Sequence, residues 1–306
     1  MAGNALMSII RLSRPINLLI ITATMVGVYF YLGKVETIFE IDPLHFSLLV
    51  IATILIAAAG NIINDYYDLT ADKVNKPNKV IFTKHLSRAL GIKIYLVINL
   101  IGLGIGLYLS VVYETYWYFS VHSLCILFLW FYSFYLKKIL VLGNILIASL
   151  TAFIPMYTAS FYSFGTELKM HTQENAKVWY ESFYFEFIVI LTVFALLQNL
   201  AREIWKDASD IEGDQAIGVV SIPMKFGIKN TQKIIGLILV AEIGLFFMII
   251  ERLQLNLSWS GFITLTVALM INILILMLMY QKDVFIKYCD SLLKLSMVLG
   301  LSTLYF

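Results

Sequence analysis

Two triplets of aspartate with the same spacing, i, i+3 and i+7, are the residues of this chain that point most directly to chemistry. They are Asp65, Asp68 and Asp72, and, 142 residues further along, Asp207, Asp210 and Asp214. Residues three, four and seven apart share one face of a helix, so each triplet is expected to form a ridge of negative charge. Mg²⁺ takes oxygen ligands and commonly shares them between carboxylates and substrate phosphates. The two ridges therefore predict a site for Mg²⁺ ions that bind a diphosphate.

Basic residues follow both triplets and supply the charge that phosphate oxygens need. The available cations are Lys73, Lys76, Lys79, Arg88, Lys137, Lys138, Arg202 and Lys206. The simpler alternative is a pair of solvated helix ends that carry acids by chance, because an aspartate at the membrane edge costs much less than one inside the bilayer. Repetition of one acidic spacing at two corresponding places favours metal and phosphate binding.

The composition excludes an ordinary soluble domain, because 60% of the 306 residues are hydrophobic and only 14% are charged. Apolar runs of about 18 residues or more indicate membrane-spanning helices. Nine are expected, at about 16–33, 46–64, 90–112, 117–136, 140–161, 183–200, 231–250, 259–280 and 289–306. We predict an all-α integral membrane protein with about nine transmembrane helices around a central cavity. It is expected to form a single domain over residues 1–306.

The loops predict the orientation in the membrane. With an odd number of spans, one side holds the N-terminus and nearly all of the 22 Lys and Arg residues; the exceptions are Lys34, Lys169, Lys177 and Arg252. The positive-inside rule makes that side cytoplasmic. We expect a multi-pass protein of the cell (inner or cytoplasmic) membrane, with its N-terminus and both aspartate triplets at the cytoplasmic face.

Other cofactor and partner classes find little support. Cys125 and Cys289 fall in separate predicted spans, and the four histidines are scattered, so no His/Cys metal spacing occurs. The net charge of +2 predicts no nucleic-acid partner. No obligate protein partner is evident, and membrane lipids are the expected surroundings.

The first triplet resembles the Asn-Asp-x-x-Asp-x-x-x-Asp motif of the UbiA superfamily of intramembrane prenyltransferases, here in residues 64–72. Residues 210–214 resemble its Asp-x-x-x-Asp motif, followed by a Gly, Ser and Pro-containing stretch at 217–223. Further details resemble the digeranylgeranylglyceryl phosphate synthase branch, as in residues 14–17, 132–138, 143–144 and 202–207. Residues 75–79 depart from the usual Asn-Arg-Pro-x-Arg-Pro, because Lys76 and Lys79 replace both arginines.

The resemblance implies Mg²⁺-dependent transfer of a prenyl group, geranylgeranyl in this branch, from a polyprenyl diphosphate donor to a lipid acceptor, geranylgeranylglyceryl phosphate. It implies Asp68, Asp72, Asp210 and Asp214 as catalytic metal ligands. Asn64, Asp65 and Asp207 are implied as further ligands or support. The expected substrate-binding residues are Lys137, Lys138, Arg202, Lys206, Lys76, Lys79, Arg14 and Tyr132.

Two alternatives stay open at this point. Within the enzyme class, the acceptor is an aromatic acid of quinone synthesis, 4-hydroxybenzoate or a dihydroxynaphthoate. In another class, the protein is a cation transporter that uses the aspartates as ion sites. Transporters tend to place such charges near the middle of the bilayer on broken helices, whereas these acids lie at helix ends followed by cations.

Overall fold

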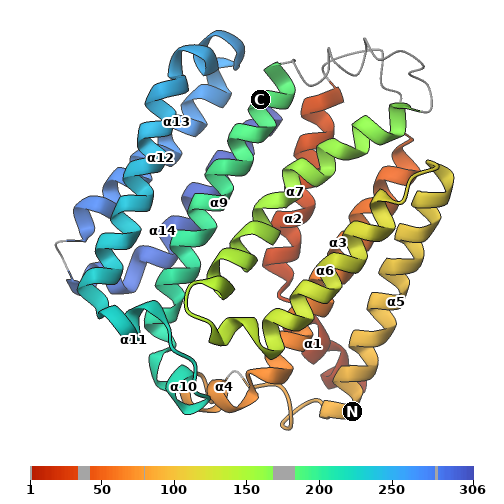
Figure 1. Ribbon diagram of the computed structural model, residues 1–306, viewed down its shortest axis with the longest axis vertical. Helices are drawn as coiled ribbons and strands as arrows, with labels where there is room; N and C mark the ends of the chain where they lie inside the picture. Colours follow the sequence, from red (N-terminus) through yellow and green to blue (C-terminus); the bar gives the residue numbers. More distant parts are fainter. Residues whose placement is uncertain (1, 34–41, 79, 168–182, 280–281) are drawn as a thin grey trace. The chain divides into compact units, whose positions relative to one another are not determined.

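The computed structural model describes residues 2–33, 42–78, 80–167, 183–279 and 282–306, and these are helical almost throughout (Figure 1). Within the described residues the only extended pairing is an isolated bridge between Phe82 and Leu86. Contacts divide the chain into two compact units. The first comprises residues 1–23, 40–146 and 210–220, and the second comprises residues 24–39, 147–209 and 221–306.

The first unit holds long helices together with three short ones. The long helices are α1 (Ala2–Leu12), the start of α2 (Pro15–Gly33), α3 (Pro43–Tyr67), α5 (Arg88–Val112), α6 (Trp117–Phe134) and the start of α7 (Leu142–Glu167). The short ones are α4 (Leu69–Asn75), the 3₁₀ helix η1 (Leu136–Lys138) and α10 (Ile211–Ala216). Helix α3 packs against both α5 and α6.

The second unit contains the remainder of α2 and α7 and the C-terminal helices. These are α9 (Phe183–Ser209), α11 (Ile222–Phe226), α12 (Ile228–Asn256), α13 (Trp259–Leu278), α14 (Lys282–Ser302) and the 3₁₀ helix η2 (Thr303–Tyr305). Buried polar contacts join three of them. The amide of Gln198 on α9 donates to Asn272 Oδ1 of α13 at 2.8 Å and to Ser296 Oγ of α14 at 2.7 Å.

Eight described helices are long and apolar enough to cross a membrane: α2, α3, α5, α6, α7, α9, α12 and α13. They coincide with the first eight predicted spans, so the prediction of an all-α membrane protein is confirmed. The ninth predicted span, 289–306, falls in α14 and η2, and α14 is not among the eight. Lys282, Asp283, Lys287, Asp290 and Lys294 make this helix more polar than the others. The count of nine stays a prediction.

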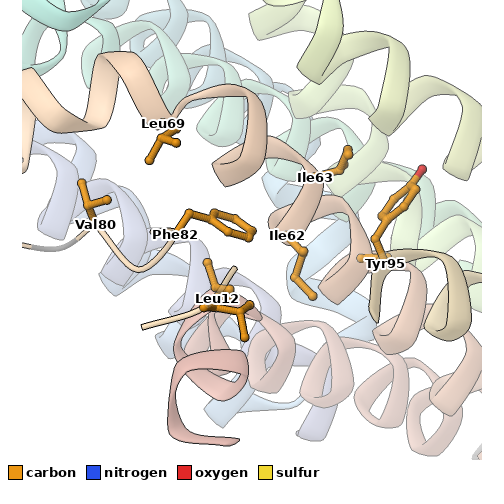
Figure 2. Packing of buried hydrophobic residues seen from close by; sticks show 9 residues of the cluster. Leu12, Ile62, Ile63, Leu69, Val80, Phe82 and Tyr95 are labelled. Carbon is orange, nitrogen blue, oxygen red and sulfur yellow. The ribbon is translucent and has the colours of Figure 1, made fainter. Parts of the chain in front are cut away.

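A compact apolar cluster supports the end of α3, next to the first aspartate triplet (Figure 2). Ile62 and Ile63 of α3 and Leu69 of α4 pack with Leu12 of α1 and with Phe82, a residue that is 1% exposed. Residues on both sides of Asn64–Asp68 are therefore buried in the same core. Burial of this kind contributes about 25 cal/mol per Å² of apolar surface, which anchors the polar residues between them.

Candidate functional site

Both aspartate triplets lie where one helix ends and a short helix begins. Asp68 follows α3 and is the N-cap of α4, and Asp210 follows α9 and is the N-cap of α10. The expectation of an unbroken helix through each triplet is therefore wrong, because the chain turns at the middle aspartate. Asp72 and Asp214 take the fourth position of α4 and α10, where their N–H groups donate to Asp68 O at 2.8 Å and Asp210 O at 2.9 Å.

The two short helices begin at corresponding residues of the two motifs, and they pack against each other within the first unit. Four carboxylates thus sit at equivalent N-cap and fourth positions of two contacting helices, in each case half-buried. Lys76, at the end of α4, reaches across to α10, where its Nζ lies 2.7 Å from Asp210 Oδ1. The two motifs are therefore neighbours in the first unit, and their role as one metal and diphosphate site stays a prediction.

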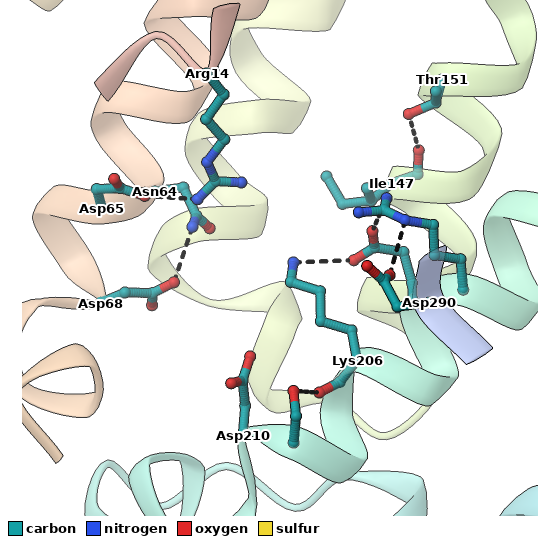
Figure 3. A network of polar contacts seen from close by, with 12 residues as sticks. Arg14, Asn64, Asp65, Asp68, Ile147, Thr151, Lys206, Asp210 and Asp290 are labelled. Atoms are coloured by element: carbon teal, nitrogen blue, oxygen red, sulfur yellow. Dashed lines mark hydrogen bonds and ion pairs between the residues drawn. The ribbon is translucent and has the colours of Figure 1, made fainter. Parts of the chain in front are cut away.

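Basic side chains pair with the carboxylates of the first motif. Arg14 donates to Asp65 Oδ1 at 2.6 Å, as Figure 3 shows. Arg14 has a φ of 55°, a left-handed conformation that is uncommon outside glycine and often marks functional positions. Asp68 forms an ion pair with Lys137 and accepts a hydrogen bond from the Asn64 amide at 2.8 Å. The Lys137 and Asp68 side chains are only 12% and 21% exposed, so water screens this pair weakly.

Lys137 is held in place by a close backbone contact. It lies in η1, which follows α6 and precedes α7. A Cβ at Gly143, near the start of α7, would lie 2.9 Å from Lys137 Cα and 3.2 Å from a ring carbon of Tyr132. Only glycine leaves room for this approach. Lys138, by contrast, is exposed. Gly143 is a supporting residue whose role the sequence alone did not reveal.

Lys79 lies outside the described residues. The ring of Tyr66 faces the guanidinium of Arg88 at 4.2 Å and also contacts Phe82. Tyr66 therefore packs beside the site, and its ring face already binds a cation.

In the second unit, two predicted phosphate-binding residues are members of an ion-pair network. Arg202 Nε lies 3.0 Å from Asp290 Oδ1 (Figure 3), and Arg202 Nη1 lies 3.4 Å from Glu203 Oε1. Lys206 Nζ lies 3.4 Å from the other oxygen of Glu203, a side chain that is 11% exposed. Asp207 follows on the same helix, α9, and is half-buried. The sequence pattern did not indicate that Glu203 and Asp290 are the partners of these cations.

Electrostatic repulsion accumulates at Asp72. Burial raises the pKa of its carboxyl above the ordinary 3.8, and the negative charges of Asp65 and Asp210 raise it further, while Lys76 and Arg14 lower it. Within the described residues no group of three or more His, Cys, Asp or Glu side chains is arranged to hold a metal ion. The residues nevertheless fit Mg²⁺ chemically, because the donors are hard carboxylate and amide oxygens, and a divalent cation would relieve the repulsion at Asp72.

We expect Asp72→Asn to raise the thermal unfolding temperature of the protein in EDTA at pH 7. A carboxyl whose pKa is raised on folding destabilises the folded state when ionised, and asparagine removes that charge. The gain should shrink as the pH falls through the folded pKa of Asp72 and vanish below about 3.8. Asp65→Asn is the matched control and should not raise the temperature, because it breaks the pair with Arg14. A lower unfolding temperature for Asp72→Asn than for the wild type at pH 7 would contradict this electrostatic account.

Comparison with solved structures supports the fold. A structure from work on digeranylgeranylglyceryl phosphate synthase in membranes has a TM-score of 0.65 at 24% identity and covers 98% of this chain and 97% of its own. An apo UbiA homolog from Aeropyrum pernix K1 has a TM-score of 0.70 at 14% identity, covering 93% and 95%. A UbiA homolog from Archaeoglobus fulgidus bound to DMAPP and Mg²⁺ has a TM-score of 0.55 at 15% identity, covering 97% and 99%.

Sequence comparison identifies the family. A Thermococcus sibiricus protein named digeranylgeranylglyceryl phosphate synthase is 32% identical over 226 residues, which cover 74% of this chain and 70% of the relative. A protein of the same name from Korarchaeum cryptofilum is 29% identical over 254 residues, covering 81% and 80%. The sequence profile of the UbiA prenyltransferase family matches residues 18–297. The chain belongs to the UbiA prenyltransferase family.

Proposed function

We propose that this enzyme transfers a geranylgeranyl group from geranylgeranyl diphosphate to the free hydroxyl of geranylgeranylglyceryl phosphate, releasing diphosphate. The chain belongs to a family of prenyltransferases, and relatives that are about 30% identical to it are named digeranylgeranylglyceryl phosphate synthase. One observation carries the proposal for the site: four aspartates occupy matching N-cap and fourth positions of the contacting helices α4 and α10, with Lys76 and Lys137 paired to the two N-cap residues. The names of these relatives favour the lipid acceptor over the aromatic acids of quinone synthesis.

Asn64, Asp68, Asp72, Asp210 and Asp214 are the residues proposed to hold Mg²⁺, with Asp65 in support. When bound, Mg²⁺ stabilises the charge that grows on the departing diphosphate. A UbiA homolog from Archaeoglobus fulgidus, described as bound to DMAPP and Mg²⁺, supports this choice of metal.

The basic residues of this chain are proposed to bind the diphosphate directly. Lys137 and Lys76 carry positive charge within reach of Asp68 and Asp210, so their ammonium groups can move from carboxylate to phosphate oxygens when the donor enters. Preorganised charge of this kind lowers a barrier in which negative charge moves onto a leaving group. Arg14 holds Asp65. The roles of Lys138, Lys79, Tyr132, Arg202, Lys206 and Asp207 stay predictions.

The reaction breaks the bond between the prenyl carbon and the diphosphate oxygen and forms an ether bond to the acceptor oxygen. The acceptor hydroxyl loses its proton, and diphosphate leaves with the bonding electron pair. An allylic carbon bears positive charge well, so the residues need mainly to bind diphosphate, exclude water and orient the acceptor.

We further propose that the protein forms one domain over residues 1–306 and lies in the cytoplasmic membrane. The N-terminus and both aspartate motifs would face the cytoplasm, as the distribution of Lys and Arg indicates. A water-soluble diphosphate headgroup then reaches the site from the cytoplasm, while the isoprenoid chains remain in the lipid phase.

Membranes that contain this protein should form the diether product from [³H]geranylgeranyl diphosphate and geranylgeranylglyceryl phosphate when Mg²⁺ is present, and should lose this activity in EDTA. Aromatic acceptors should be offered side by side. Product with 4-hydroxybenzoate or a dihydroxynaphthoate alone would overturn the proposed acceptor. Mg²⁺ flux into proteoliposomes without any prenyl transfer would instead identify a transporter.

Asp68→Asn and Asp210→Asn should each lower kcat/KM by about 100-fold or more at a fixed Mg²⁺ concentration, because each removes one charge that organises the diphosphate site. Glu212→Gln is the matched control, since Glu212 is an exposed acid in the same helix as Asp214. Retained folding is checked by the unfolding temperature in detergent. Equal losses of kcat/KM for Glu212→Gln and Asp210→Asn would mean that activity depends on surface charge in general and not on the motif.

Gly143→Ala should raise KM for the prenyl diphosphate by about 10- to 100-fold, because the new methyl group displaces η1 and moves Lys137. Lys137→Ala should have an effect of similar size, and the double variant should be little worse than either single one. Gly104→Ala is the control, because a Cβ there meets nothing within 4 Å. Additive losses in the double variant would show that Gly143 does not act through Lys137.

A further inference from the structure

Helix α10 begins without the hydrogen bond that its own N-cap residue normally makes. An aspartate at an N-cap usually accepts a hydrogen bond from the N–H of the second or third helical residue. Asp210 is the N-cap of α10, but its side chain makes no capping hydrogen bond. Its Oδ1 accepts instead from Lys76 Nζ at 2.7 Å. The carboxylate therefore lies away from the helix that it begins.

The missing cap is supplied by Asn75, which lies 135 positions before Asp210 in the chain. Gly213, the third residue of α10, donates its N–H to Asn75 Oδ1 at 2.7 Å. The same amide donates from Nδ2 to Asp210 O at 3.1 Å. Asn75 is the last residue of α4, so one side chain closes the end of one motif helix onto the beginning of the other.

The size of residue 213 allows this contact. A Cβ at Gly213 would lie 2.3 Å from Asn75 Nδ2 and 2.6 Å from Ala71 O, distances at which backbone or side chain must shift. Ala71 is the residue of the first motif that corresponds to Gly213, so the two motif helices touch at equivalent positions. The close approach and the cap therefore depend on each other.

We propose that Asn75 is a positioning residue that caps α10 in place of Asp210 and so leaves the Asp210 carboxylate for the metal and diphosphate site. This inference rests on the proposed function for the role of Asp210, but the capping itself does not. Without Asn75, the Asp210 carboxylate can turn back onto the N–H of Gly213, which competes with ligand binding. Residues that orient metal ligands typically change metal affinity by about 10- to 100-fold when removed.

The capping is tested by hydrogen–deuterium exchange at the Gly213 amide in metal-free, detergent-solubilised full-length protein. Asn75→Ala should speed this exchange by about 3- to 30-fold, the range expected for loss of a cap. Asp210→Ala should leave it unchanged, and Asn75→Ala/Asp210→Ala should exchange fastest. Asn75→Asp retains an acceptor for Gly213 and should restore protection. Amides of α13 serve as the folding control in every variant.

The positioning role is tested by titration with Mn²⁺ and pyrophosphate, followed by electron paramagnetic resonance. Asn75→Ala should weaken Mn²⁺ binding by about 10- to 100-fold. Gly213→Ala should do the same, because its methyl group would lie 2.3 Å from Asn75 Nδ2 and displace this amide. Gly244→Ala, where a Cβ meets nothing within 4 Å, should not.

Two results would overturn the inference. The first is faster Gly213 exchange in Asp210→Ala with none in Asn75→Ala, and the second is Mn²⁺ binding by Asn75→Ala equal to that of the wild type. Failure of the proposed function is recognised separately, because wild-type protein would then bind no Mn²⁺ with pyrophosphate while the exchange pattern at Gly213 remained as expected.

Discussion

Repulsion between closely spaced carboxylates is the constraint on which the described site depends. Half-buried acids at two helix ends repel one another, and Arg14, Lys76 and Lys137 place positive charge beside Asp65, Asp210 and Asp68. The effect of this repulsion is seen at Asp72, where burial and the neighbouring acids raise the pKa of the carboxyl. At Asp72 the positive charges of Lys76 and Arg14 thus only partly compensate for burial and for the negative charges of Asp65 and Asp210. A divalent ion would complete that compensation, which links metal binding to the electrostatics of the fold.

Breaks in the helices determine where the carboxylates of the two motifs lie. An uninterrupted helix would point the three aspartates of each motif along one face, whereas a turn at the middle residue places two of them at the start of a new short helix. Apolar packing of Ile62, Ile63 and Leu69 fixes one break. A cap from Asn75 fixes the other. Close contacts that a larger residue would prevent keep Lys137 next to Gly143 and Asn75 next to Gly213.

Sequence periodicity and motif spacing were sufficient for much of this architecture. The eight strongest apolar runs coincide with eight helices, because length and hydropathy decide membrane helices with little help from tertiary contacts. Spacing also identified Asp68, Asp72, Asp210 and Asp214 as equivalent pairs. It could not show that the helices break at Asp68 and Asp210, that Arg88 lies over Tyr66, or that Asn75 caps a distant helix. Those features depend on long-range side-chain contacts, which leave no periodic signal.

The central claim is that the paired N-cap and fourth-position aspartates hold divalent metal together with diphosphate. Anomalous X-ray diffraction from crystals grown with Mn²⁺ and a non-hydrolysable geranylgeranyl thiodiphosphate tests it most directly. We predict manganese peaks ligated by oxygens of Asp68, Asp72, Asp210 and Asp214, with Lys76 or Lys137 moved from carboxylate to phosphate oxygens. Diphosphate bound without metal at these residues, or manganese located only elsewhere, would contradict the account.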